Sequence, residues 1–522
     1  MADRSGTLVP APARAPSFEE LTAEQHRILA YASAIGSEFD FELLVAAMAV
    51  DEEALAEQLE RLVHLGVLRE RPGGDRFGFA EEEFRGRVYR SLTESRLRVL
   101  HRKIAEVLER TNPNPSGAVL ADLGRHYFLG KVPEKSHRYN QRAAEAARAA
   151  GEPDVAAHHL ERVLLDLASL PGDRRHEQGE VAEALGDLYF SISDFASADR
   201  YYTQALERLA SAEPRTRARL LLARSEVMRE NLDLEGARRG ALEAQHLFQT
   251  AGDRVGLAQS SRLLGRVAFS RGAYRDALDE SMRALELAAE GDDPRFRGRL
   301  SIDIGNSFAL LGPEVRSIAI EWYERAVERL EEAGDWVELS RAYHNLGVTV
   351  GESRPQEGLE YLERAREAGE RGHDARSTGR ALLSGVELRL ALGDLEEAER
   401  DNEQAGRLLE RLTDDLGLEL VEVNRGQIAE KRGQWDDGER SYLRAIDWCV
   451  RHQLAGDEAE VELYLARLRF KTRNLDGARE ALRRATELGV VELRPQLVPI
   501  FDELNRQLGA TPSTGTPPST AG

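Results

Sequence analysis

Small residues recur along this chain at a nearly constant spacing. Nine alanine or glycine positions lie 39 to 42 residues apart: Ala156, Ala198, Ala237, Ala277, Ala319, Gly358, Ala398, Gly438 and Ala478. A fixed period in this range is typical of a solenoid in which each repeat is a pair of helices. Because no pair can bury its apolar face alone, neighbouring pairs must stack. The spacing therefore predicts a long helical array with an extended surface for binding other molecules.

The residues around these positions also repeat. The clearest copies are Leu185-Gly186 with Tyr189, Phe195, Ala198, Tyr202 and Ala205, then Leu264-Gly265 with Tyr274, Ala277 and Ala284, and Ile304-Gly305 with Phe308, Ala319, Tyr323 and Ala326. This pattern resembles the tetratricopeptide family over about three quarters of the chain, although the common unit of that family is shorter, at about 34 residues. The resemblance implies an all-α fold, a tetratricopeptide superhelix of about nine helix pairs, with a concave groove lined by the first helix of each pair.

Composition limits the class of partner. The 92 acidic and 71 basic residues give a net charge of -21, which disfavours nucleic acid and anionic membranes as partners. The single cysteine, Cys449, excludes an internal disulfide. The first residues contain no apolar segment of signal-peptide length, and no stretch of about 18 apolar residues occurs anywhere. We therefore expect a cytoplasmic protein with no membrane span.

Segment boundaries follow changes in composition. Residues 1–17 and the Ser/Thr/Pro-rich tail, 509–522, are expected to be disordered. Residues 18–110 form a separate N-terminal domain, and Pro and Gly residues mark a linker at 111–117 before the array at 118–508. The helices expected at the two ends of the array are 118–129, 135–150 and the terminal capping helix 492–508.

The N-terminal domain has the element order of a winged helix. Thr22 and Gln25 have the spacing of a capping box at the start of its first helix. A turn at Pro72-Gly73-Gly74-Asp75 separates two short apolar runs, which predicts a β-hairpin. The expected elements are helices 21–35, 41–48, 51–65 and 81–110 and strands 67–71 and 76–79.

Short segments of this domain carry a second resemblance. They are Gly36-Ser37-Glu38-Phe39-Asp40, Leu43-Leu44, Leu59-x-x-Leu62-Val63, Gly66-Val67-Leu68-Arg69-Glu70 and, further on, His126-Tyr127-Phe128. Together they resemble the winged-helix module of STAND-class signalling ATPases, the maltose-activator-like regulators. In that family the module lies between a nucleotide-binding domain and a tetratricopeptide sensor.

Two features of that family are missing from this chain. No G-x-x-x-x-G-K-[ST] phosphate loop occurs in the sequence. In the family, a nucleotide-contacting His follows the wing and precedes an Arg, a Glu and a Tyr. Here Glu81 replaces that His and Gly86 replaces the Glu, while Arg85 and Tyr89 are kept. The chain is thus similar to the sensor half of such a regulator without its ATPase, which implies no nucleotide cofactor.

The winged helix could read DNA through its third helix. That helix offers one cation, Arg61, against five acidic residues: Asp51, Glu52, Glu53, Glu57 and Glu60. A recognition helix needs cations that face phosphates and base edges. The charge balance favours a module that packs against protein, and a transcription regulator that binds DNA is kept as an alternative.

No catalytic or metal site is predicted. The sequence has no H-E-x-x-H motif, no paired cysteines and no nucleophile elbow. The adjacent pair His158 and His159 is interpreted as part of a helix surface, and Cys449 as a buried structural thiol. We therefore expect a protein that is not an enzyme and that needs no cofactor.

The inner face of the array is the candidate binding site. In tetratricopeptide superhelices, first-helix residues six and three before the glycine position, and one and four after it, face the groove. In the central pairs these positions include Arg262, Arg266, Phe269, Arg299, Asn306, Arg341, His344 and Arg380. Guanidinium donors suit carboxylates, which indicates an acidic peptide or helix as the ligand. The alternative interpretation is that these arginines form salt bridges within the array.

These observations support one leading hypothesis and two alternatives. The leading hypothesis is a non-enzymatic scaffold or sensor in bacterial signalling that binds a protein or peptide, such as a kinase or an ATPase, in the groove. The alternatives are a transcription regulator that uses its winged helix on DNA and a sensor of a small ligand.

Overall fold

The computed structural model describes residues 20–73, 75–209, 213–288, 293–412, 414–494 and 497–509. The chain divides into two compact units, Met1–Gly256 and Leu257–Gly522. Segment 1–17 and all but the first residue of 509–522, both expected to be disordered, lie outside the described residues.

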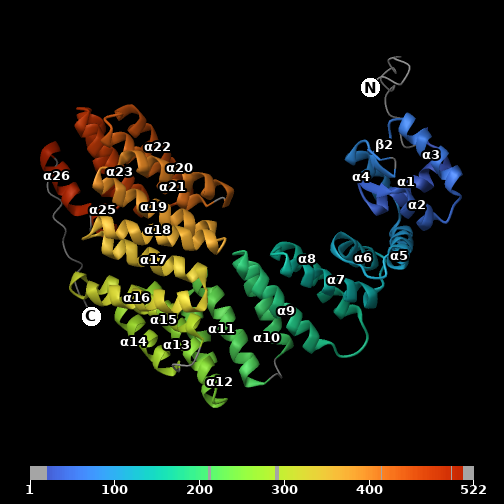
Figure 1. The fold of residues 1–522 in the computed structure, drawn as a ribbon, viewed down its shortest axis with the longest axis horizontal. Helices are drawn as coiled ribbons and strands as arrows, with labels where there is room; N and C mark the ends of the chain where they lie inside the picture. The colour runs from blue at the N-terminus through green and yellow to red at the C-terminus, as the bar shows by residue number, and fades with distance from the viewer. Residues whose placement is uncertain are drawn as a thin grey trace. The chain divides into compact units, whose positions relative to one another are not determined.

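The first unit contains a small sheet and twelve described helices (Figure 1). In chain order its elements are α1 (Ala23–Ile35), β1 (Glu38–Asp40), α2 (Phe41–Met48), α3 (Glu52–His64), β2 (Leu68–Glu70), β3 (Arg76–Phe79), α4 (Glu82–Ser91), α5 (Glu94–Thr111), α6 (Gly117–Leu129), α7 (Pro133–Ala149), α8 (Pro153–Ser169), α9 (Arg175–Ser191), α10 (Phe195–Arg208), α11 (Pro214–Glu230) and α12 (Leu234–Thr250).

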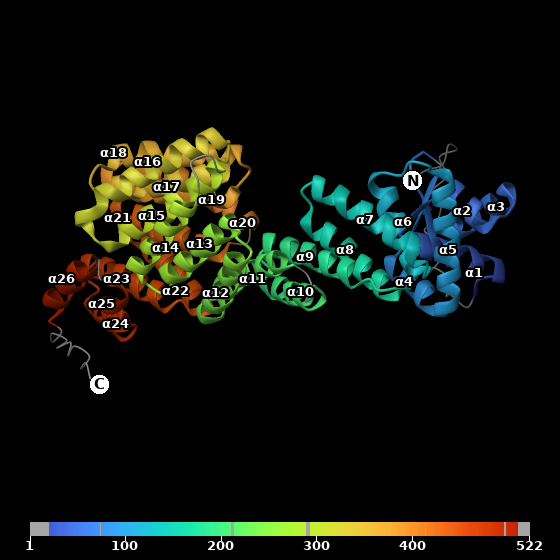
Figure 2. The same ribbon diagram turned by 90° about the horizontal axis from the view of Figure 1, so that it is seen from below.

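The second unit is helical throughout its described residues, and its helices run side by side in succession (Figures 1 and 2). Its elements are α13 (Arg254–Ser270), which crosses the division between the units, α14 (Tyr274–Leu287), α15 (Pro294–Leu311), the short 3-10 helix η2 (Pro313–Val315), α16 (Arg316–Ala333), α17 (Trp336–Gly351), α18 (Pro355–Arg371), α19 (Ala375–Leu392), α20 (Leu395–Leu412), α21 (Asp415–Lys431), α22 (Trp435–His452), α23 (Ala455–Lys471), α24 (Leu475–Glu487), α25 (Val490–Leu493) and α26 (Val498–Leu508).

The repeat of paired helices predicted from the sequence is confirmed. The nine evenly spaced small residues lie on the second helix of successive pairs, that is, on the even-numbered helices from α8 to α24. They are buried; Ala198 and Ala319 have no exposed surface, and Ala277 has 1%. The first array helices appear as α6 and α7, which pack on each other, and α7 also packs on α8.

Glycine stands where a first helix meets a tyrosine of the second helix. A Cβ added to Gly186, Gly305 or Gly426 would lie 2.5 to 2.7 Å from the nearest ring atom of the facing tyrosine. Real Cβ atoms do not approach other atoms so closely, so the predicted close approach of the paired helices depends on these glycines. The facing tyrosines are Tyr202, Tyr323 and Tyr442.

The N-terminal domain contains the predicted hairpin and one further strand. Strands β2 and β3 pair antiparallel, and β1 pairs with the other edge of β3, so the strand order is β1-β3-β2. Phe39 of β1 stacks on Phe77 of β3 with ring centroids 6.1 Å apart. The sequence analysis missed β1 because three residues are too few for a period-two pattern.

The predicted capping box of α1 is present. Gln25 N–H donates to Thr22 Oγ1 (3.2 Å), and Thr22 N–H donates to Gln25 Oε1 (3.0 Å). The single helix predicted over 81–110 is wrong, because the chain breaks into α4 and α5. Thr93 starts the second of these helices by accepting a hydrogen bond from the N–H of Arg96 (3.3 Å).

The continuous helix predicted over 492–508 is also wrong. The structure has the short α25 and then α26, with residues 495–496 outside the described ones. Arg494 precedes a proline and has φ -134° and ψ 66°, outside the helical region. A residue before proline is disfavoured from the helical region, which accounts for the break.

A glutamate joins three successive helices in the first unit. Glu161 of α8 accepts hydrogen bonds from Tyr189 of α9 and Tyr201 of α10, both at 2.8 Å. The two tyrosine rings stack with centroids 5.4 Å apart. Glu109 of α5 does the same with a stacked tyrosine pair on α6 and α7.

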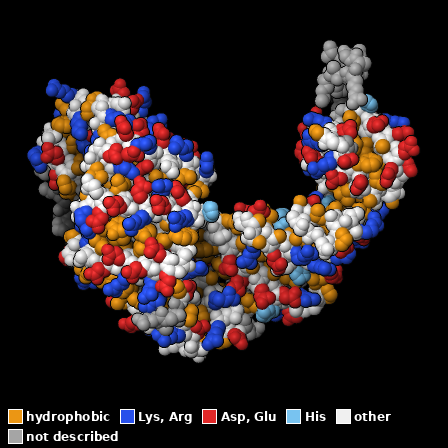
Figure 3. Space-filling view, viewed as in Figure 1, with side chains coloured by type: hydrophobic (Ala, Val, Ile, Leu, Met, Phe, Trp, Pro, Cys, Tyr) orange, Lys and Arg blue, Asp and Glu red, His pale blue; other side chains and the backbone are white. Residues whose placement is uncertain are grey.

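Charge is mixed over the surface. On the face seen in Figure 3, Asp and Glu side chains are interspersed with Lys and Arg over the helices. The net charge of -21 therefore does not gather in one patch on that face. None of the described helices is long and apolar enough to cross a membrane.

Candidate functional site

The first helices of the second unit meet along one side of the pairs. Helices α15, α17, α19 and α21 contact one another in succession, and side-chain hydrogen bonds or ion pairs cross from α13 to α15, from α15 to α17 and from α17 to α19. We call this surface the first-helix face. It contains the eight predicted site residues together with Asp303, Asp335, Glu338, Asn345, Val348, Ser384, Glu387 and Leu420.

The predicted residues of α13 are engaged within the protein. Arg262 Nε lies 2.7 Å from Asp303 Oδ2 of α15, and both side chains are largely buried, 16% and 10% exposed. Arg266 is also engaged in an interaction. Phe269 packs against Tyr274 of α14 with ring centroids 5.4 Å apart. A half-buried ion pair of this kind neutralises Arg262, so that residue is a poor anchor for an anion on its own.

Two further predicted arginines share carboxylates at the N-terminal end of α17, where Asp335 is the N-cap. Arg299 of α15 lies 3.2 Å from Asp335 and 3.3 Å from Glu338, measured between nitrogen and oxygen. Arg341 lies 2.7 Å from the same Glu338. Two guanidinium groups are thus balanced by two carboxylates, as the salt-bridge interpretation of the sequence proposed.

The other predicted polar residues form a hydrogen-bonded chain across three pairs. Tyr323 O–H and Asn345 Nδ2 both donate to Asn306 Oδ1, each at 2.8 Å. His344 Nδ1 lies 3.2 Å from Asn345 Oδ1, and His344 Nε2 lies 3.0 Å from Ser384 Oγ. We call these five residues the polar relay; it connects α16, α15, α17 and α19.

The relay fixes the protonation of its histidine. Burial lowers the pKa of His344 to about 4, so the imidazole is neutral at pH 7. An amide oxygen can only accept, so Nδ1 carries the proton toward Asn345 and Nε2 accepts from the Ser384 hydroxyl. Every contact along the relay then joins one donor to one acceptor.

Arg380 and Glu387 differ from the paired charges. Both lie on α19 and both are exposed. Within the described part of the chain, neither has a hydrogen-bond or ion-pair partner. Burial, followed by the charge of Arg341, lowers the pKa of Arg380, and burial, followed by the charge of Glu460, raises the pKa of Glu387.

Protein atoms lie around Arg380 and Glu387 although both side chains are exposed, because burial is the first cause of each pKa shift. Arg380 and Glu387 are seven residues apart on α19, which is two helical turns or about 10 Å. Helix α19 therefore presents one positive and one negative side chain about two turns apart.

Apolar side chains flank these charges. Val348 of α17 is 39% exposed and Leu420 of α21 is 44% exposed. Val348 directly follows Gly347 and Leu420 lies six residues before Gly426, so both occupy positions that the sequence pattern predicts to face the groove. The sequence analysis tracked polar residues at these positions and missed the two apolar ones, although the same spacing marks them.

Two residues outside this face, Cys449 and His159, are buried. Cys449 is fully buried, its Sγ lies 3.7 Å from Glu419 Oε1, and burial raises the pKa of the thiol, in keeping with a structural role. The assignment of His159 to a helix surface is wrong. His159 is 5% exposed and donates from Nδ1 to Asn140 Oδ1 (2.8 Å), because this side of α8 packs on α7.

Tyr89, a residue kept from the STAND-like motif, contacts a buried histidine pair. Tyr89 OH lies 2.9 Å from His101 Nε2, and His101 Nδ1 lies 2.8 Å from His126 Nδ1. Burial lowers the pKa of His101 to about 4 and holds the pKa of His126 well below its usual value. Tyr89 thus belongs to a neutral contact between α4, α5 and α6.

Solved structures similar to this chain were found, whereas the sequence matches no protein-family model and no curated protein. One is a STAND protein with a tetratricopeptide repeat sensor from Pyrococcus horikoshii, 13% identical, with a TM-score of 0.47; the match covers 85% of this chain and 66% of that chain. This chain thus spans about two thirds of the length of that protein.

Two other similar structures are a Rap protein and an aspartyl phosphate phosphatase. A Rap protein complexed with competence and sporulation factor is 14% identical, with a TM-score of 0.38, and the match covers 78% of this chain and 94% of that one. Aspartyl phosphate phosphatase F from Bacillus subtilis is 12% identical, with a TM-score of 0.39, and the match covers 77% and 90% of the two chains.

Proposed function

We propose that this tetratricopeptide-like repeat protein is a non-enzymatic scaffold or sensor in bacterial signalling, whose first-helix face binds a peptide or helix of a partner protein. The observation that carries the proposal is the pair Arg380 and Glu387, two exposed charges of opposite sign without partners within the described residues. We assign the rest of the binding face to Arg262, Arg266, Phe269, Arg299, Asn306, Arg341 and His344.

Charge complementarity supports this proposal. Burial, followed by the charge of Arg341 at Arg380 and the charge of Glu460 at Glu387, shifts each pKa against the charged form. A partner carboxylate at Arg380 and a partner cation at Glu387 would relieve both penalties, because opposite charges favour the charged form. The expected ligand segment therefore carries an acidic and a basic residue about 10 Å apart, which is two turns of a helix.

The exposed apolar residues add contact area for such a segment. Val348 and Leu420 lie on the helices to either side of α19. Binding sites commonly combine apolar surface with a few placed polar groups that fix orientation. In this proposal the two charges orient the segment and the two apolar side chains contribute burial.

The DNA-binding alternative has less support. The acidic residues of α3, including Glu52, Glu53 and Glu57, are exposed. In the wing, Arg71 pairs with Glu38, and Arg76 lies 2.9 Å from Asp40. Cations already paired within the domain are poorly placed to replace the counterions of a phosphate backbone.

Charge reversal tests the proposal. A partner is first captured from native lysate with the wild-type chain, purified, and titrated against Arg380→Glu, Glu387→Arg and the double variant. Each single reversal should weaken binding at least tenfold, since a charged hydrogen bond is worth about 1.5–3 kcal/mol. Added salt should also weaken binding, because part of the attraction is screened.

The control is Arg411→Glu, an exposed change on the second helix α20. It alters the net charge by the same amount as Arg380→Glu and should leave affinity and helicity unchanged. Partner affinity that is indifferent to both reversals on α19 would contradict the assignment of the binding site to this face.

A further inference from the structure

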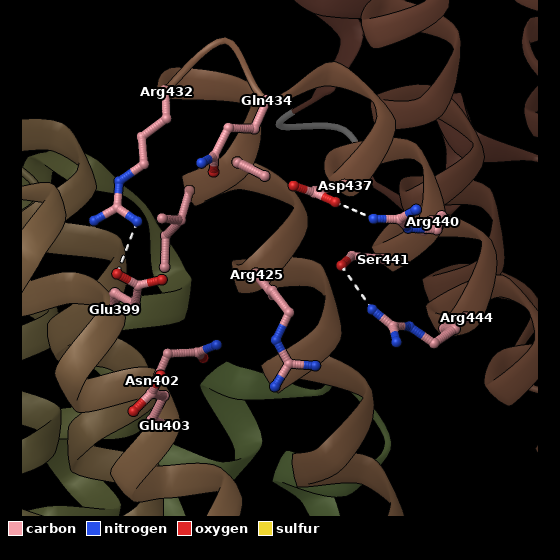
Figure 4. A pocket seen from close by; sticks show the side chains of 12 residues that line it. Glu399, Asn402, Glu403, Arg425, Arg432, Gln434, Asp437, Arg440, Ser441 and Arg444 are labelled. Atoms are coloured by element: carbon pink, nitrogen blue, oxygen red, sulfur yellow. Dashed lines mark hydrogen bonds and ion pairs between the residues drawn. The ribbon is translucent and has the colours of Figure 1, made fainter.

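A cavity of about 300 Å³ lies between the second helices α20 and α22, over the first helix α21 (Figure 4). Its floor includes Ile428 and Ala429 of α21. These residues lie on a different side of α21 from Leu420, because successive helical residues turn by about 100°. The cavity is therefore separate from the first-helix face.

In one half of the cavity, each arginine is paired with its own carboxylate. Arg432 lies 2.7 Å from Glu399, and Arg440 pairs with Asp437. Each cation in this half has its own carboxylate, so this half has no charge to offer a ligand.

The other half has unbalanced charges on opposite walls. Arg425 and Arg444 both pair with the single carboxylate of Glu422, at 3.0 Å for Arg444, which leaves one positive charge in excess. Across the cavity, Glu403 of α20 has only a distant contact of 3.7 Å with Arg407, and both side chains are largely exposed. Figure 4 shows Glu403 on the α20 side, Arg444 on the α22 side and Arg425 between them.

A buried amide oxygen lies beside the negative wall. Asn402 lines the cavity and is 3% exposed. Its Nδ2 donates to the carbonyl oxygen of Val421 (2.9 Å), which fixes the orientation of the amide. Its Oδ1 has no hydrogen-bond partner among the described residues. Buried acceptors without a donor are rare and costly, but this oxygen has less than 1 Å² of accessible surface and is therefore closed to a ligand in the cavity.

We propose that this cavity binds a small zwitterion, namely a free amino acid or a short peptide. The ammonium group of the ligand lies toward Glu403, since it supplies three donors and a positive charge. The carboxylate lies toward Arg425 and Arg444, whose planar guanidinium groups bind carboxylates in a fork geometry. The apolar floor accepts the aliphatic part of the ligand.

The ligand's two charges make the proposal specific. A simple anion would satisfy the arginine wall and leave the charge of Glu403 uncompensated. A simple cation would do the reverse. Only a molecule with both groups compensates the excess charge on each wall, and the ligand length that fits best distinguishes an amino acid from a peptide.

The experiment uses the full chain and a panel of the free L-amino acids and their glycyl dipeptides, followed by calorimetry and thermal shift. At least one member should bind, and N-acetylation or C-terminal amidation of that member should each weaken binding at least tenfold, because each removes one charge. Tighter binding of the free amino acid or of its dipeptide identifies which of the two the cavity takes.

Two variants test whether the ligand binds in this cavity. Glu403→Gln and Arg444→Gln change exposed side chains and should each weaken binding at least tenfold. In Glu403→Gln, moreover, N-acetylation should no longer matter, because the partner of the ammonium group is gone. Glu410→Gln, an exposed change on the same helix, is the matched control and should bind as wild type.

Three outcomes would overturn the proposal. The first is no binding by any panel member up to about 10 mM, a range that covers weak ligands. The second is binding indifferent to N-acetylation, which would make the cavity a simple anion site. The third is binding that survives both variants, which would place the ligand elsewhere. None of these outcomes bears on the first-helix face.

Discussion

Single glycines determine how closely the helices of a pair approach. Gly358 of α18 faces the backbone of α17, and an added Cβ would lie 2.6 Å from the carbonyl oxygen of Gly347 and closer still to the Cα of Gly351. Backbone atoms cannot rotate away as a flexible side chain can. This position therefore requires a hydrogen in place of any side chain.

We expect Gly358→Ala to destabilise the protein by about 1–3 kcal/mol, because the added methyl group forces the two helices apart. Gly385→Ala in α19 is the matched control. Its Cβ would meet only ordinary contacts, at 3.7 Å and beyond, so the gain in helix propensity of up to about 1 kcal/mol should make it neutral or stabilising. Urea unfolding followed by circular dichroism measures both, and equal midpoints would show that the helices can separate freely.

Among the elements, α8, α9 and α10 are held together by one carboxylate. Glu161 accepts from two tyrosine hydroxyls, and burial raises the pKa of Tyr201 to about 12, so that phenol keeps its proton at ordinary pH. The bond joins helices of two successive pairs and supplements their apolar packing.

Glu161→Ala should remove the acceptor for both phenols at a cost of about 1–3 kcal/mol. Because the stability of a solenoid is roughly a sum over repeats and their interfaces, the loss should stay local. Hydrogen exchange should therefore accelerate in α8 to α10 and remain unchanged in α19 to α24. Glu161→Gln keeps an acceptor oxygen and should show a smaller effect; acceleration spread evenly over the chain would argue against local stability.

Most helices and strands could be predicted from the sequence, and the errors lie where one helix ends and the next begins. The helix pairs follow from the 40-residue spacing because each pair repeats the same packing requirement. The break before Thr93 was missed because the apolar pattern continues on both sides of it, and only the side-chain hydrogen bond to the Arg96 N–H reveals the new start.

The candidate site could be predicted only in part. The spacing placed Arg262 and Arg299 on the correct helices, yet their carboxylates, Asp303 and Asp335, lie on the next first helix, 41 and 36 residues further along the chain. Helical periodicity describes neighbours within one helix and does not reach such partners. For that reason the sequence could not distinguish the paired arginines from Arg380.

On the scale of the whole molecule, neutral buried histidines link stability to pH. Burial lowers the pKa of His101, His159 and His344 to about 4 each and holds the pKa of His126 well below its usual value. The unfolded chain, with a histidine pKa of about 6.5, binds more protons than the native chain between about pH 6.5 and pH 4. The stabilisation is therefore complete above pH 6.5 and is lost as the pH falls.

Each such histidine should lower the free energy of unfolding by up to about 1.4 kcal/mol per pH unit across this window. The raised pKa values of Asp166 and Glu419, about 6 and about 7, oppose part of this decrease. Urea unfolding from about pH 7 to about pH 4.5 measures the slope. His159→Gln removes one titrating group and should flatten the slope, with the side-chain amide still able to donate to Asn140. An unchanged slope would mean that His159 takes up its proton in the folded protein as readily as in the unfolded one.

The polar relay requires its helix pairs to follow one another in a fixed order. Two of its contacts cross between pairs: Asn345 of α17 donates to Asn306 of α15, and His344 of α17 contacts Ser384 of α19. A duplicated or transposed pair would keep the generic contacts of alanine and glycine but would offer its new neighbour the wrong polar atom. We therefore expect the pairs from α15 to α19 to keep their order, because an exchanged pair would leave these polar atoms without their partners.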